Sequence, residues 1–61
     1  MNAANENEYR IGIYEGWDMD RWVLLASIRA ADDAAANAYA EAHFSEHEWY
    51  IFDADGNDIN G

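Results

Sequence analysis

The charge imbalance of this chain limits what it can fold into. Thirteen Asp and Glu residues are set against three Arg and no Lys, which gives a formal net charge of −10 on 61 residues. Like charges at this density repel one another and weaken any compact state. There is no cysteine, so no disulfide offsets the repulsion. Burial of apolar side chains therefore has to stabilise the fold, although a domain of this size is only marginally stable.

The apolar content is sufficient for a folded body. Hydrophobic residues make up 51% of the chain and aromatic residues 15%, which is not the composition of a disordered acidic segment. Residues 1–8 are polar and lack the features of a signal peptide, so we expect a flexible lead-in there and one small domain over 9–61. The uncharged apolar run at 22–28 is too short to cross a membrane. We expect a cytoplasmic protein with no membrane partner and no cofactor.

The hydrophobic pattern predicts an α+β fold with the order strand, strand, helix, strand. Residues 9–14 alternate with the period of a strand, a turn-rich segment follows, and 21–29 form a second apolar run of strand length. Residues 31–43 are rich in alanine and predict a helix. At 100° per residue, one side of this helix is a stripe of small side chains that we expect to be buried: Ala31, Ala34, Ala35, Ala38 and Ala42. Residues 48–53 predict the third strand.

Connection rules place the first strand in the centre of the sheet. A crossover through the helix brings the third strand parallel to the second, giving the spatial order 2-1-3 with the first strand antiparallel to both neighbours. One helix covers only one face of such a sheet. The bare face is expected to expose some of Tyr14, Trp22, Trp49, Tyr50 and Phe52, and exposed aromatic patches often mark interfaces.

Carboxylates recur in every segment instead of forming one run. Dispersal over a folded body gives a rigid acidic surface, which can occupy the phosphate sites of a basic groove. The same acidity repels nucleic acid itself, so the expected partner is a basic nucleic-acid-binding protein. Candidate contact residues are Glu15, Asp18, Asp20, Asp32, Asp33, Glu41, Glu46, Glu48, Asp53 and Asp55, with the aromatic residues Trp17, Tyr50 and Phe52.

Catalytic and metal-binding patterns are weak, and we expect no enzyme. Ser27 and Ser45 have no Asp and His arranged as a triad. His43 and His47 are four residues apart, but the helix is expected to end between them, which favours solvated side chains over a metal site. The acidic segment at 53–58 does not have the spacing of a calcium-binding loop.

The third predicted strand and its turn, residues 48–56, have the pattern E-W-x-I-x-D-x-D-G. This pattern resembles the E-W-x-I-x-D-x-E-G signature in the N-terminal module of the ArdA-type antirestriction proteins, acidic DNA mimics that inhibit type I restriction enzymes. The resemblance implies that Glu48, Asp53 and Asp55 belong to a charged surface. Small anti-CRISPR proteins are another class with these general properties.

The sequence leaves several functions open. The first is a non-enzymatic, DNA-mimicking inhibitor of a bacterial defence complex, directed at restriction or CRISPR machinery. The second is a small assembly module that forms a homodimer through the exposed aromatic sheet face. The third is an acidic antitoxin that neutralises a basic toxin. Solubility and adaptation to high salt also explain acidity, although six asparagines fit salt adaptation poorly.

Overall fold

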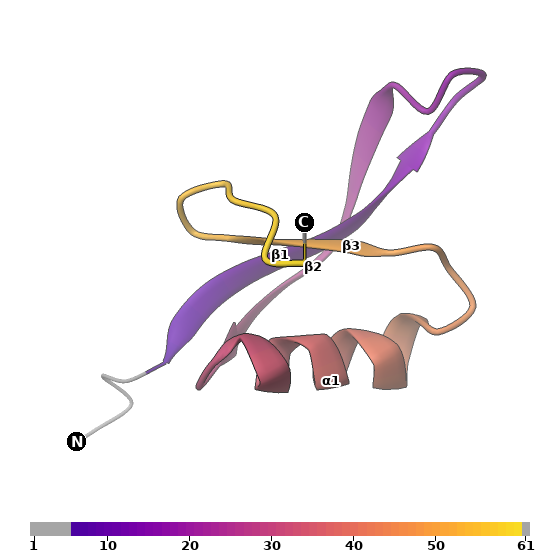
Figure 1. Cartoon of the computed structure of the whole chain (residues 1–61). Coiled ribbons are helices and arrows are strands. Elements are labelled where there is room, and N and C mark those ends of the chain that lie inside the picture. Colours follow the sequence, from indigo (N-terminus) through magenta and orange to yellow (C-terminus); the bar gives the residue numbers. More distant parts are fainter. Residues whose placement is uncertain (1–5, 61) are drawn as a thin grey trace.

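The predicted order of elements is confirmed. The computed structural model describes residues 6–60 and contains strand β1 (Asn7–Glu15), strand β2 (Arg21–Ala30), helix α1 (Asp33–Phe44) and strand β3 (Tyr50–Asp53) (Figure 1). β1 begins two residues earlier than predicted, so residues 7 and 8 belong to the sheet and not to a lead-in. Residues 1–5 of the expected lead-in lie outside the described residues.

The sheet has the predicted spatial order, β2-β1-β3, with β1 antiparallel to both neighbours. β2 pairs with β1 along its whole length, from Asn7 opposite Ala30 to Glu15 opposite Arg21. β3 pairs only with the stretch of β1 from Tyr9 to Gly12. The distal half of the hairpin is therefore a two-stranded ribbon that extends beyond β3 and α1 (Figure 1).

The core lies between α1 and one face of the sheet. Its large members, Tyr9, Ile11 and Ile51, come from the central and third strands, as the small side chains of the helix require. The helix contributes Ala36 and Ala40, which are fully buried. The predicted alanine stripe is wrong, because the positions assigned to it in α1 are exposed. Alanine occupies nearly every side of this helix, so its periodicity carries no information about which side is buried.

Two aspartates at the start of α1 set its position against the sheet. Asp32 is the N-cap, and its Oδ1 accepts a hydrogen bond from the backbone N–H of Ala35 at 2.9 Å. Asp33 occupies the first turn, where the helix dipole favours a carboxylate, and it accepts a hydrogen bond from the Tyr9 hydroxyl. α1 ends at Phe44, between His43 and His47, as predicted.

The chain after β3 folds back alongside it. The backbone N–H of Gly56 donates to the carbonyl of Asp53, and Asp58 forms an isolated bridge with Phe52. Ile59 then packs against the core, and its N–H donates to the carbonyl of Ile51 at 3.3 Å. This segment shields the edge of β3 that would otherwise be unpaired.

The sheet face opposite α1 carries an aromatic cluster of Tyr14, Trp22, Tyr50 and Phe52. The Tyr14 ring centroid lies 5.2 Å from that of Trp22 and 5.1 Å from that of Tyr50, and Trp22 lies 5.1 Å from Phe52. These distances suit tilted and edge-to-face contacts. The aromatic side chains shield one another but remain partly exposed. Trp49, another candidate for this face, packs against the core instead.

Gly12 makes room for this cluster. A Cβ atom at Gly12 would lie 2.6 Å from Cζ2 of Trp22 and would also overlap the carbonyl oxygen of Val23. The pairing of β1 with β2 shifts at this point, between Ile11 and Gly12, as in a β-bulge. Such irregularities bend and twist a hairpin. The tryptophan ring therefore lies directly over the backbone of the central strand.

Candidate functional site

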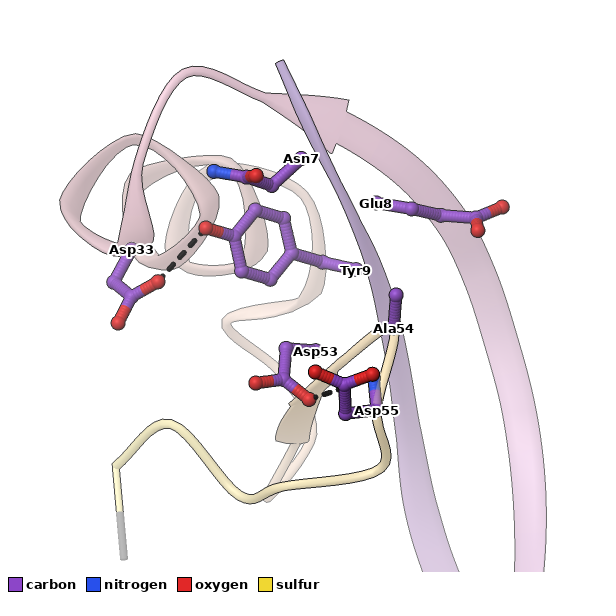
Figure 2. A pocket seen from close by; sticks show the side chains of 7 residues that line it. All are labelled: Asn7, Glu8, Tyr9, Asp33, Asp53, Ala54 and Asp55. Atoms are coloured by element: carbon purple, nitrogen blue, oxygen red, sulfur yellow. Dashed lines mark hydrogen bonds between the residues drawn. The ribbon is translucent and has the colours of Figure 1, made fainter. Parts of the chain in front are cut away.

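Carboxylates gather at the end of the fold where β1 begins, α1 begins and β3 ends. We call this the acidic end, and it surrounds an open depression of about 290 Å³. Its acidic side chains are Glu8, Asp33, Asp53 and Asp55, and the remaining lining residues are Asn7, Tyr9 and Ala54. Figure 2 shows Glu8 pointing away from the other three carboxylates, on the far side of β1. The start of α1, the end of β3 and the turn after β3 thus bring Asp33, Asp53 and Asp55 to one concave surface.

Tyr9 connects the acidic end to the core. Its side chain is 1% exposed, and its hydroxyl donates a hydrogen bond to Oδ1 of Asp33 at 2.7 Å (Figure 2). This hydrogen bond is the main cause that raises the pKa of the tyrosine above its ordinary value, with burial adding to it. The phenol therefore remains a neutral donor, and Asp33 is held in one orientation by a residue of the central strand.

Backbone amides fix Asp53 in a similar way. Its Oδ1 accepts hydrogen bonds from the N–H groups of Asp55 and Asn57, both at 2.9 Å. The bond from Asn57 is the largest of the causes that hold the pKa of Asp53 below its ordinary value, and it outweighs the opposing effect of burial. Asp53 is thus a charged group at the centre of an ordered turn.

The ionised form of Asp53 is expected to stabilise the fold at neutral pH. Because its folded-state pKa lies below its unfolded-state value of about 4, the contribution is complete above that value and is lost as the pH falls through the folded-state pKa. Asp53→Asn should therefore melt at a lower temperature than the parent at pH 7, and the difference in melting temperature should narrow as the pH falls below about 4. Thermal unfolding followed by circular dichroism measures the melting temperatures of the parent and the variant at each pH. A difference in melting temperature that stays constant with pH would show that the charge of Asp53 is not stabilising.

A second group of acids lies at the hairpin tip, which comprises Glu15, Asp18 and Asp20 with Trp17 and Met19. The turn is closed by the N–H of Met19, which donates to the carbonyl of Gly16 at 3.2 Å. Arg21 approaches Glu15 at 4.0 Å, and both side chains are largely in water, where such an ion pair contributes little.

Trp17 is fully exposed at this tip, with an accessibility of 100%, so it does not fold back over the sheet edge. Met19 beside it is 50% exposed. The hairpin tip therefore presents a large apolar side chain among carboxylates.

The remaining candidate acids are not brought together with these groups. Glu41 is exposed on α1, while Glu46 and Glu48 are exposed in the segment between α1 and β3. Asp32 is next to the acidic end in sequence, but its carboxylate caps the helix. Tyr50 and Phe52 belong to the aromatic cluster on the open sheet face. The predicted acidic surface is therefore divided, with its densest part at the acidic end.

Sequence reasoning missed the part that Glu8 and Tyr9 play at the acidic end. The signal was present in the predicted topology, because pairing the first strand antiparallel to the third brings the start of one near the end of the other. Tyr9 is in fact directly opposite Asp53. The missing information was the register, which periodicity alone does not supply.

No group of three or more His, Asp or Glu side chains within residues 6–60 is arranged to hold a metal ion. His43 instead stacks on Tyr39, with ring centroids 4.1 Å apart. None of the helices formed by these residues has the length and hydropathy to span a membrane.

Comparisons of the chain with protein-family models, with curated proteins and with solved structures found no match. Function therefore has to be argued from the chemistry of the surfaces described above.

Proposed function

We propose that this protein is a non-enzymatic inhibitor that fills the basic groove of a nucleic-acid-binding protein, as part of the conflict between mobile elements and bacterial defence complexes. The observation that carries this proposal is the acidic end, where Asp33, Asp53 and Asp55 surround one depression. Two of these carboxylates are oriented by hydrogen bonds to Tyr9 and to backbone amides. Fixed carboxylates can replace phosphates at cationic sites without the entropy cost of ordering flexible side chains.

The spacing of the two acidic groups supports the same function. Tyr9, which lies opposite Asp53 at the acidic end, and Glu15 at the hairpin tip are the third and last residues of β1. Six residues of extended strand span roughly 20 Å. Duplex DNA carries one charge per about 1.7 Å of axis, so this distance corresponds to about six base pairs. The resemblance of residues 48–56 to the antirestriction signature agrees with this reading.

The hairpin tip adds an apolar contact to the electrostatic one. Trp17 is exposed to solvent, and Asp18 and Asp20 follow it in the same turn. Tryptophan is enriched among the residues that dominate binding energy when buried at an interface. A groove that accepts the acidic surface and offers an apolar pocket for Trp17 is the expected form of the target.

Capture from an extract of the cell that makes the protein tests this function. The immobilised chain is expected to retain a nucleic-acid-binding protein, and a short DNA duplex should release it by competing for the same groove. Identification of the released protein by mass spectrometry distinguishes restriction, CRISPR and toxin targets. Failure of DNA to release any captured protein would contradict the proposal.

Matched charge variants show whether the placement of the acids matters. The triple variant Asp18→Asn, Asp20→Asn, Asp55→Asn removes carboxylates that form no hydrogen bond within residues 6–60. The control Glu41→Gln, Glu46→Gln, Glu48→Gln removes the same charge, and both have a net charge of −10 + 3 = −7. We expect the first variant to bind at least about tenfold more weakly than the control, by the loss of about three charge contacts. Equal losses of affinity in the two variants would contradict the proposal, because they would show that only the net charge of the protein matters.

A further inference from the structure

The open face of the sheet differs in charge from the rest of the molecule. Strand alternation and the register place Glu8, Arg10 and Arg29 on the same face as Gly12, opposite α1. Asp58 is paired with Phe52 at the edge of this face. These positions carry two positive and two negative side chains, so the strand-paired part of the open face is close to neutral in a protein with a net charge of −10.

The same face is also rich in apolar side chains. It holds the aromatic cluster together with Leu24, which lies opposite Gly12 and is 51% exposed. A sheet covered by a helix on one side needs a second layer to bury its other side. A basic partner would find few carboxylates here, and a nucleic acid would be repelled by the protein as a whole.

We propose that this face is the interface of a homodimer in which two sheets pack against each other. Everywhere else two copies repel, because both are strongly acidic, whereas the open face combines apolar side chains with balanced charge. A two-fold axis makes the contact reciprocal, so Arg10 and Arg29 of each copy can face Glu8 or Asp58 of the other. Aromatic side chains are enriched in the buried centres of such interfaces.

Salt separates this proposal from the proposed function. Added salt screens the repulsion between two acidic copies and strengthens the apolar contact, so dimerisation should tighten as NaCl increases. Binding of the acidic end to a basic groove should weaken under the same conditions. The two proposals can therefore fail independently.

Sedimentation velocity of the full chain, from micromolar to millimolar concentration and at low and high NaCl, tests the dimer. The parent is expected to form dimers that increase with salt. Leu24→Glu and Leu24→Lys should each weaken the dimer by at least about tenfold, because both place a charge in the apolar contact. Tyr39→Glu is the control, since Tyr39 is 39% exposed on α1 and far from the open face in topology.

Circular dichroism checks that each variant is folded. The fold should tolerate both substitutions of Leu24, because this residue is already 51% exposed. A parent that remains monomeric at every concentration and salt would overturn the proposal. Dimers that persist unchanged in both Leu24 variants would also overturn it, because another surface would then make the contact.

Discussion

Ile51→Ala is expected to leave a large fraction of the chain unfolded at 25 °C. Ile51 is fully buried in β3 and packs with Tyr9 and Ile11, the other two large side chains that are fully buried among residues 6–60. Truncation of a buried isoleucine to alanine costs about 2–5 kcal/mol. A core of this size rarely supplies more than about 3–5 kcal/mol of net stability. The single substitution therefore removes most or all of the stability.

Urea denaturation followed by tryptophan fluorescence measures this loss. Ile51→Val is the matched control, because it removes one methyl group and should cost only about 0.5–1.5 kcal/mol. The two variants should differ clearly in denaturation midpoint. Unfolding of Ile51→Ala at nearly the same urea concentration as the parent would contradict the burial of Ile51 between β3 and α1.

Gly12→Ala is expected to be nearly as damaging although it adds a single methyl group. The added Cβ atom would meet Cζ2 of Trp22 at 2.6 Å and the backbone oxygen of Val23, which cannot move without separating β1 from β2. Forcing extra atoms into packed structure costs about 1–3 kcal/mol, and this site is at the upper end of the range because backbone is involved.

Gly56→Ala provides the comparison for that substitution. Gly56 has a φ of 87°, so alanine there is strained, but no atom lies within 4 Å of the added Cβ. Its cost should be limited to about 1–2 kcal/mol of backbone strain. Near-ultraviolet circular dichroism should change in Gly12→Ala, because the environment of Trp22 is altered, and not in Gly56→Ala. Equal effects of the two variants would contradict the close approach of Trp22 to the central strand.

The topology was predictable because it depends on the order of elements and on connection rules. The pattern of residues 9–14 and 21–29 indicated a hairpin, and the crossover through the helix then determined the position of β3. The exposure of Tyr14, Trp22, Tyr50 and Phe52 followed from the presence of one helix. Each of these steps used the hydrophobic pattern or the order of the elements, and neither depends on the exact register of the strands.

The orientation of α1 could not be predicted for a physical reason. A helix with alanine on nearly every side has no preferred apolar face, so the burial of Ala36 and Ala40 depends on contacts with the sheet that the helix sequence does not encode. The acidic end was missed for a different reason. Glu8, Asp33 and Asp53 are far apart in sequence, and only the register of β1 with β3 brings them together.

The proposed function depends most on the binding of ordered carboxylates in a positively charged groove. The most direct test is the dissociation constant for the protein that DNA releases from the immobilised chain, measured at increasing NaCl. Between 50 and 200 mM salt the affinity should fall by at least about tenfold, and the fall should be shallower for Asp18→Asn, Asp20→Asn, Asp55→Asn. An affinity that does not change over this range would contradict the account.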